Sequence, residues 1–355
     1  MAKKILYAIV GVGAGNTSRT LAILEQLPPN KYEICFVSQG KAYELISSRF
    51  HTHKLGEITY TKGNFNMLSI LRHNYSFPYK FVRNVQQAAG IIDQFKPDVV
   101  IVDSDFFFLY PARKRKIPII SINSSIATVK KFQQFRAHIF DKFFSYYFIE
   151  KVDCWLQEIF ADRVICPIIT KIDGLNEKFH QVYPIVRKQF LVDRTYSDNV
   201  TFEYDIAVMF GGSGISTREI DLRTFKGNCL ILGQKERLKL PPNAHVIDFD
   251  FEPAKYLSRA KIIVIQGGLN SISEVIAMRK PAVFVPIKGH AEQFANAQWA
   301  QELGIGIVSG GNTVVDAISH VEANYDDFLK KCEELTIPCN GALQAASLIQ
   351  EFVDG

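Results

Sequence analysis

The sequence of 355 residues lacks an apolar run long enough to span a bilayer. Near its start, basic residues precede the short apolar run 5–10, as they do in a secretory signal peptide, but this run passes directly into a glycine-rich loop. We therefore interpret residues 5–10 as a first β-strand and expect a cytoplasmic protein.

Cysteine is scarce, with six residues, and none of them has the paired short spacing of a metal or redox motif. Their scatter through expected strands and helices is typical of thiols that are buried or unreactive. We therefore expect no metal site. A recognised nucleic-acid-binding module, a low-complexity segment and a short-period repeat are also absent from the sequence, which argues against a nucleic-acid partner.

The net charge of +5 conceals an asymmetry between the two halves of the chain. Residues 1–194 contain 27 Lys and Arg against 16 Asp and Glu, a balance of +11, whereas the remainder contains 14 against 20, a balance of −6. A basic half attracts an anionic membrane surface or an anionic acceptor, since each Lys or Arg near an acidic surface contributes about 1 kcal/mol. The alternative is a solvated basic face without a partner.

Alternating buried strands and helices predict an α/β fold with two Rossmann-like, doubly wound domains. The strand KILYAIV leads into the glycine loop GVGAG and a helix, and YEICFVS forms the next strand. This second strand ends in Ser38 and Gln39, and the missing acidic residue argues against a dinucleotide cofactor.

The same pattern restarts at DIAVMF, which is followed by the glycine turn GGSGIS, an expected helix at 216–225 and further strands. Between the two patterns the periodicity is lost, so the linker is expected within residues 190–204. This gives an amino-terminal domain at 1–195, a second domain at 205–340 and a terminal helix in 341–355.

One segment of the second half combines a buried strand, IIVI, with a glycine pair and an amphipathic helix. Gly267 and Gly268 let backbone N–H groups approach a ligand, and the helix N-terminus that follows favours an anion. Asn270 and Ser271 add side-chain donors, and Glu274 follows one turn later, where a ribose diol would lie. The pattern equally fits a plain strand-to-helix turn, with Asn270 or Ser271 as the cap and Glu274 completing a capping box.

The next strand, AVFVP, leads into the loop KGHAEQ at its carboxyl end, where open α/β sheets bind ligands. In order and spacing, GGLNSISE, KPAVFVP and EQFANA resemble the donor-binding signature of the GT-B glycosyltransferases, especially the lipid-II-forming (MurG-like) N-acetylglucosaminyltransferases and other UDP-sugar transferases. The resemblance covers most of the chain and is strong from about residue 205. It implies a GT-B fold with two domains facing a central cleft and a terminal helix that packs across the domain junction.

The resemblance assigns the nucleotide contacts of the donor. FGGSGIS is similar to the phosphate-side turn of these enzymes, so Gly212 and Ser213 would face the diphosphate. Phe249 resembles the aromatic residue that covers the uracil, unless it is plain core. Asp250 resembles the residue whose backbone reads the uracil edge.

The resemblance also assigns contacts to the remaining parts of the donor. Ser271 would contact the phosphate and Glu274 the ribose, while Glu292 and Gln293 resemble the pair that touches the sugar hydroxyls. His290 lies close to these sugar contacts in the sequence. It is a weaker candidate for a catalytic base, and the alternative is a polar lining of the loop.

The first glycine loop departs from the family pattern. In GAGNTSR, the residues Gly13, Gly15 and Arg19 resemble the acceptor-side loop, but Asn16 stands where related transferases often carry the histidine that removes the acceptor proton. An amide is not basic, so Asn16 cannot take that proton. This departure also fits an acceptor that is already acidic, such as a phosphate or a carboxylate.

Two carboxylates at the end of the strand VVIVD are candidates for the missing base. Asp105, or Asp103 beside it, stands where the family often has an aspartate, and a carboxylate can act as a general base if it reaches the nucleophile. The alternative is that Asp103 caps a helix and Asp105 is solvated.

The run KKFQQFRAHIFDKFFSYYFIEKV predicts an amphipathic helix that either packs on the core or contacts a membrane. The resemblance implies an inverting hexosyltransferase of cell-envelope polysaccharide synthesis, with a UDP-sugar as donor substrate and no metal or cofactor. Its acceptor would be a lipid-linked or other membrane glycan at the inner face of the cell membrane. A UDP-sugar hydrolase or epimerase on the same fold, and a non-catalytic nucleotide-sugar-binding protein, are the alternatives.

Overall fold

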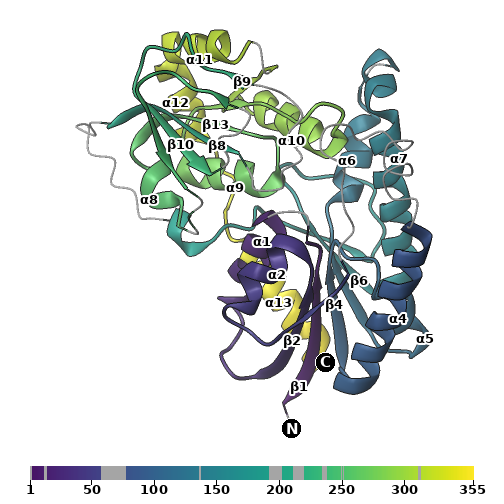
Figure 1. Ribbon diagram of the computed structural model, residues 1–355. Coiled ribbons are helices and arrows are strands. Elements are labelled where there is room, and N and C mark those ends of the chain that lie inside the picture. Colours follow the sequence, from purple (N-terminus) through teal and green to yellow (C-terminus); the bar gives the residue numbers. More distant parts are fainter. Residues whose placement is uncertain are drawn as a thin grey trace. The chain divides into compact units, whose positions relative to one another are not determined.

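A computed structural model describes residues 2–11, 14–56, 77–135, 137–191, 202–210, 220–233, 238–248, 250, 252–310 and 313–355. The chain forms two compact units (Figure 1). The first unit comprises Met1–Ile185 and Asn340–Gly355, and the second comprises Val186–Cys339. Within the described ranges, no helix is both long enough and apolar enough to cross a membrane.

The first unit is built on a seven-stranded parallel sheet of order β3-β2-β1-β4-β5-β6-β7. Its strands are β1 (Lys3–Ile9), β2 (Tyr32–Ser38), β3 (Thr52–Lys54), β4 (Val99–Asp103), β5 (Ile119–Ile122), β6 (Arg163–Pro167) and β7 (Phe179–Val182). The strand order reverses between β1 and β4, and open α/β sheets bind ligands at the carboxyl ends of the strands beside such a reversal.

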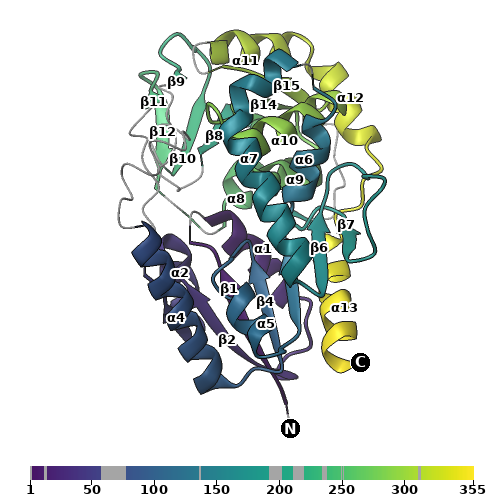
Figure 2. The same ribbon diagram turned by 90° about the vertical axis from the view of Figure 1, so that its right-hand side faces the viewer.

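Helices cover both faces of this sheet, as parallel strands require. They are α1 (Ala14–Leu24), α2 (Gly40–Ser47), α4 (Phe77–Phe95), α5 (Leu109–Lys114), α6 (Ser125–Phe132), α7 (Ala137–Phe160) and α13 (Gly341–Asp354). One core cluster joins α4, α5 and α7 to the same sheet face (Figure 2). Side chains from β1, β2 and β4 on that face are fully buried, which anchors the three helices.

The terminal helix α13 belongs to the first unit, where it packs on α1, β6 and β7. Arg163 of β6 donates to the carbonyl oxygen of Leu348 over 2.9 Å. Near its end, Asp354 pairs with Lys31 at 2.6 Å. The chain therefore returns to its first unit after completing the second.

The second unit is built on a six-stranded parallel sheet of order β12-β10-β8-β13-β14-β15. Its strands are β8 (Tyr204–Phe210), β10 (Cys229–Gly233), β12 (Ala244–Ile247), β13 (Ala260–Ile265), β14 (Ala282–Phe284) and β15 (Gly306–Val308), and β9 (Ile220–Asp221) pairs with β11 (Leu238–Lys239). Its helices are η1 (Lys188–Phe190), α8 (Ala254–Leu257), α9 (Leu269–Met278), α10 (Ala291–Glu302), α11 (Val314–Ala323) and α12 (Tyr325–Glu334). Here the strand order reverses between β8 and β13.

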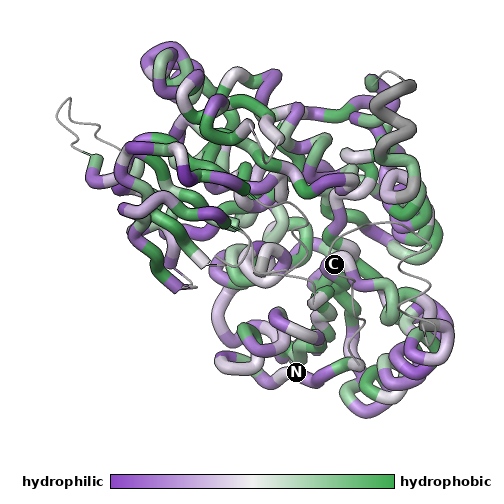
Figure 3. The backbone as a smooth tube through the Cα atoms, turned by 45° about the horizontal axis from the view of Figure 1, so that its top comes forward, coloured by the Kyte–Doolittle hydropathy of each residue, from purple (hydrophilic) through white to green (hydrophobic). Residues whose placement is uncertain are grey.

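The predicted α/β fold with two doubly wound units is confirmed. Figure 3 shows the hydropathy behind it, with green hydrophobic and purple hydrophilic stretches alternating along the backbone. The continuous apolar runs at β1, β4 and β13 have become buried strands, as in β4, where all five residues are buried.

Two predicted helices differ in the structure. The helix expected at 216–225 is wrong for its described part, because Ile220 and Asp221 form β9. Ile220 and Leu222 are buried on either side of a half-buried Asp221, which is the period of a strand. The single helix expected over 130–152 is divided, because α6 ends at Phe132 and α7 begins at Ala137.

Candidate functional site

The first glycine loop and the end of β4 meet at the strand reversal of the first unit. Arg19 of α1 is buried and forms an ion pair with the fully buried Asp103, the last residue of β4. Its Nε donates to Asp103 Oδ2 at 3.2 Å, and the Thr20 hydroxyl donates to the same oxygen at 3.2 Å. Asp103 therefore joins α1 to β4.

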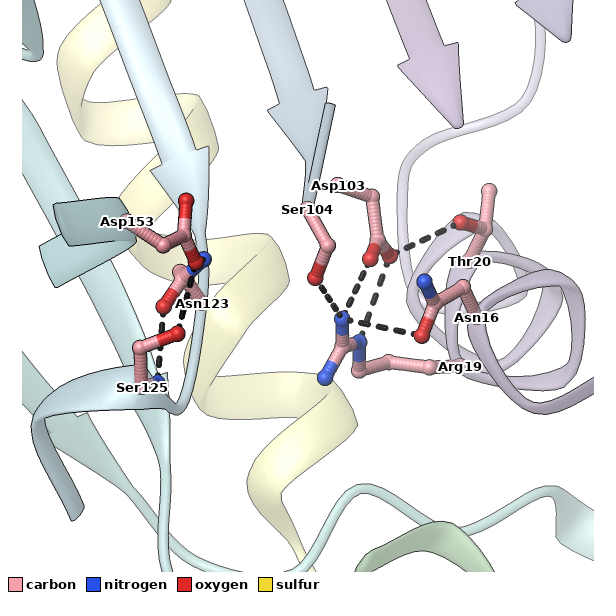
Figure 4. Close-up of polar contacts among 8 residues, drawn as sticks. All are labelled: Asn16, Arg19, Thr20, Asp103, Ser104, Asn123, Ser125 and Asp153. Carbon is pink, nitrogen blue, oxygen red and sulfur yellow. Dashed lines mark hydrogen bonds and ion pairs between the residues drawn. The ribbon is translucent and has the colours of Figure 1, made fainter. Parts of the chain in front are cut away.

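Arg19 also reaches toward the residues on both sides of the ion pair (Figure 4). Its Nη2 lies 3.4 Å from Asn16 Oδ1 and 3.5 Å from the Ser104 hydroxyl, which are long, weak contacts. Asn16 is half-buried and Gly15 is exposed. Of the predicted residues, Asn16 and Asp103 thus contact the guanidinium of Arg19, and Gly13 lies outside the described residues.

Asp105 has a different environment, because no cation is paired with it in the described part of the chain. Its Oδ1 accepts hydrogen bonds from the backbone N–H groups of Phe107, at 2.8 Å, and Phe108, at 3.3 Å. Burial raises the pKa of Asp105 to about 7, although these two hydrogen bonds lower it. A carboxyl group with a pKa near 7 is suited to proton transfer at neutral pH. Of the two predicted carboxylates, Asp103 is paired with a buried cation, and Asp105 is the one whose pKa lies near neutral.

Sequence reasoning missed a second polar cluster, which lies after β5. Asp153 of α7 accepts hydrogen bonds from Asn123 Nδ2 at 2.7 Å and from the Ser125 hydroxyl at 2.6 Å. Gln157 donates to its other oxygen at 3.0 Å. Figure 4 shows this cluster beside the Arg19 cluster. The polar letters NSS directly after the strand IISI were the signal, because β5 is the neighbour of β4.

In the second unit, the two glycines after β13 have different surroundings. A Cβ added to Gly267 would lie 2.0 Å from the carbonyl oxygen of Gln293, so Gly267 lets α10 approach β13 closely. A Cβ added to Gly268 would meet nothing within 4 Å. Gly268 is the N-cap of α9 and brings no capping side chain. The N-terminus of α9 thus has no side-chain cap at Gly268, and an uncapped helix N-terminus is suited to bind an anion.

The first two turns of α9 carry the predicted polar contacts. Asn270 and Ser271 are half-buried in the first turn. Glu274 is buried, and its Oε1 accepts a hydrogen bond from Arg187 Nη2 at 2.8 Å. Burial raises the pKa of Glu274, while the charge of Arg187 lowers it. Sequence reasoning missed Arg187, because 87 residues separate it from its partner.

The loop before α10 is held by its own side chains. His290 is the N-cap of α10, and its Nδ1 accepts from the Gln293 backbone N–H at 3.4 Å. Burial lowers the pKa of His290 to about 3, so the ring is neutral. The Gln293 side-chain oxygen accepts from the Ile287 backbone N–H at 3.0 Å, while Glu292 is half-buried in the first helical turn. His290 is therefore a cap rather than a poised base.

Asp250 has its side chain engaged within its own loop. Its Oδ1 accepts from the Glu252 backbone N–H at 2.8 Å, and its Oδ2 accepts from the Tyr256 hydroxyl at 3.0 Å. Lys255, at 2.8 Å, is the main reason that its pKa is lowered to about 2. A ligand contact of Asp250 would therefore use its backbone. Three other predicted donor contacts lie outside the described residues, namely Gly212, Ser213 and Phe249.

Comparisons with known proteins agree with this architecture. The sequence profile of glycosyl transferase family 1 matches residues 3–330. An uncharacterized glycosyltransferase of Methanosarcina mazei is 21% identical, over 98% of this chain and 99% of its own length. The UDP-N-acetylglucosamine–N-acetylmuramyl-(pentapeptide) pyrophosphoryl-undecaprenol N-acetylglucosamine transferase of Thermosipho africanus is 23% identical, over 92% of this chain and 90% of its own length.

Solved structures share the fold. MurG of Acinetobacter baumannii matches with a TM-score of 0.60 and 16% identity, covering 98% of this chain and 99% of its own. The calicheamicin glycosyltransferase CalG4 matches with a TM-score of 0.62 and 14% identity, covering 99% of this chain and 98% of its own. Their two-sheet architecture is the one described above. The chain therefore belongs to glycosyl transferase family 1 and is a glycosyltransferase of the GT-B type.

Proposed function

We propose that this glycosyltransferase moves a hexose-type sugar from a UDP-sugar to a lipid-linked or membrane-associated acceptor, with inversion and without a metal ion. The observation that carries the proposal is the edge of the second unit's sheet beside its strand reversal. There the N-terminus of α9 has no side-chain cap, a Cβ added to Gly268 would meet open space, and the buried pair of Glu274 and Arg187 lies one turn deeper.

This edge offers each part of a nucleoside diphosphate a chemical partner. The α9 N–H groups and the side chains of Asn270 and Ser271 suit the diphosphate. Glu274 suits the ribose diol, because a carboxylate accepts hydrogen bonds from two hydroxyl groups. Arg187 adds a permanent positive charge beside it. The amide nitrogen of Gln293 donates no hydrogen bond within the described ranges and suits a sugar hydroxyl.

The same groups suit the chemistry of transfer. The acceptor oxygen attacks the anomeric carbon as the bond to UDP breaks, and negative charge develops on the leaving phosphate. Backbone N–H groups at a helix N-terminus stabilise that charge without a metal. Asp105 takes the acceptor proton, since its pKa of about 7 makes it a competent base near neutral pH.

An exposed apolar face on α7 supports the membrane-associated acceptor. Five large side chains recur at spacings of three or four residues, which places them on one side of the helix. They are Phe144, Phe148, Val152, Trp155 and Ile159, and we call them the α7 stripe. Trp155 is 57% exposed and Phe144 is 55% exposed, an unusual density of exposed apolar side chains on one helix.

The neighbouring helices α4 and α5, which share a core cluster with α7, carry exposed apolar side chains as well. Tyr79 and Val82 of α4 and Tyr110 of α5 are also exposed. Exposed basic residues accompany them, among them Arg83, Lys114 and Lys151. Apolar side chains combined with positive charge are what a helix requires to lie in the interface of an anionic bilayer. We assign an anionic lipid surface as the occupant of the α7 stripe.

Product analysis tests the transfer reaction. The purified chain is incubated with a panel of UDP-sugars, with and without lipid-linked saccharide acceptors in mixed vesicles, and products are identified by mass spectrometry. Formation of UDP and a glycosylated acceptor, only when both substrates are present, is expected. Release of free or epimerised sugar without an acceptor would instead identify a hydrolase or an epimerase. Absence of any turnover with retained donor binding would identify a non-catalytic binding protein.

A further inference from the structure

Three side chains that commonly bind metals meet at the outer edge of the first unit's sheet, apart from the site described above. Cys35 lies on β2, His53 lies on β3, and His51 directly precedes β3. One ligand atom from each lies within 4.8 Å of the other two. The sequence spacing shows no metal motif, because Cys35 is separated from the His-Thr-His run by a helix.

Strand register explains why these side chains meet. β2 and β3 pair in parallel with Val37 opposite His53, and the Phe36 backbone N–H donates to the carbonyl oxygen of His51 at 3.1 Å. Because side chains alternate across a strand, Cys35, His51 and His53 all lie on one face of the sheet. The two imidazole rings are 5.1 Å apart and nearly perpendicular, at 81°.

A cation bound here would displace the thiol proton of Cys35, because metals coordinate the thiolate.

We infer that Cys35, His51 and His53 form a binding site for a borderline divalent cation, of which Zn²⁺ fits best. One sulfur and two imidazole ligands suit zinc and disfavour Mg²⁺ and Ca²⁺, which prefer oxygen. Zinc bond lengths place the ligand atoms of one ion about 3.3 to 3.6 Å apart. The exposed side chain of His51 is able to rotate and close the remaining distance.

The arrangement leaves one tetrahedral position for water, because three protein ligands are present and His51 lies at the surface. The ion would hold the three-residue edge strand β3 against β2. A stabilising role follows, since a cation that binds only the folded chain shifts the unfolding equilibrium toward the folded state. This role does not depend on sugar transfer.

Zinc binding is measured on the full chain, purified without a polyhistidine tag and stripped with EDTA, by titration against a chromogenic zinc chelator. One equivalent of zinc is expected to bind, with a rise in the melting temperature. His51→Gln and Cys35→Ala are each expected to weaken binding at least about tenfold. His320→Gln, which removes an exposed histidine of α11, serves as the matched control and should bind like the wild type.

Cobalt provides the second measurement. Co²⁺ in this site should give a sulfur-to-cobalt charge-transfer band in the near ultraviolet, which Cys35→Ala removes and His320→Gln retains. Circular dichroism checks that His51→Gln is folded, which is the expected result because His51 is exposed. The inference is overturned if the wild type binds no zinc saturably, or if His51→Gln and Cys35→Ala both retain full affinity.

Discussion

At the residue scale, Asp105 and Asp103 are two positions apart on the chain but have opposite environments. Asp105 is buried with backbone N–H partners only, whereas Asp103 is paired with Arg19. Asp105→Asn removes the proposed base while its side-chain oxygen still accepts the N–H groups. We expect kcat to fall about 10²- to 10⁴-fold. The wild-type rate should rise with pH through about 7, and the variant should lose this dependence in a steady-state pH profile.

The same substitution predicts a change in the pH dependence of stability. Because the folded-state pKa of Asp105 is raised from 3.8 to about 7, its contribution to stability is complete below about pH 4 and is lost as the pH rises through 7. Wild-type unfolding free energy should therefore fall with pH over this range by up to about 4 kcal/mol more than that of Asp105→Asn. Urea unfolding at several pH values measures this difference. An equal pH dependence of the unfolding free energy in the wild type and in Asp105→Asn would contradict the assigned protonation of Asp105.

Asp103 is expected to matter for folding. Asp103→Ala leaves the guanidinium of Arg19 buried without its carboxylate, and breaking a buried pair costs about 3–5 kcal/mol. Urea unfolding should show this loss. The matched control is Glu33→Ala, which removes a carboxylate from an exposed pair with Lys4 and should cost less than about 1 kcal/mol. An Asp103→Ala variant of wild-type stability that has lost only turnover would refute this role of Asp103 in folding.

The two glycines after β13 give a paired prediction. Gly267→Ala places a methyl group against the carbonyl oxygen of Gln293, and overpacking costs about 1–3 kcal/mol or more. Gly268→Ala meets open space and has an ordinary backbone conformation, so stability should change little. Thermal unfolding compares them. Equal losses of thermal stability in the two variants would contradict the close approach of α10 to Gly267.

At the element scale, the α7 stripe predicts lipid binding. Trp155→Ser and Phe148→Ser should each reduce sedimentation with vesicles that contain anionic phosphatidylglycerol, because each removes exposed apolar area from the contact. Leu343→Ser on α13 removes a comparably exposed side chain from another helix and is the control. Undiminished sedimentation of both stripe variants would contradict the assignment of a lipid surface.

Helices and strands were predictable wherever the apolar residues of a segment followed a single helical or strand pattern. The strand before Gly267 and the helix after Gly268 were located from a continuous apolar run followed by glycine and helical spacing. The failures have local causes. Ile220 and Leu222 are buried at a period of two inside the segment expected to form a helix, and the helix expected across Gln133 ends at Phe132. Propensity is a weak guide where tertiary contacts decide.

At the scale of the whole molecule, the sequence identified the strand ends that carry polar groups but not how those groups pair. Asp103 and Arg19 are 84 residues apart, and Arg187 lies 87 residues from Glu274. Only the tertiary fold brings such partners together, and no local pattern encodes it. Cys35 and His53 meet for the same reason, through strand register. The roles of the donor and acceptor residues in transfer remain predictions.

The central claim is that the second unit binds the UDP moiety of the donor at the N-terminus of α9. Isothermal titration of UDP into the full chain tests it most directly. We predict saturable binding of one UDP per chain, weakened at least about tenfold in Gly268→Val, which fills the open space, and unchanged in Gly90→Val, where an added side chain also meets nothing within 4 Å. The absence of saturable binding of UDP or any UDP-sugar to the folded wild type, or undiminished binding by Gly268→Val, would contradict the account.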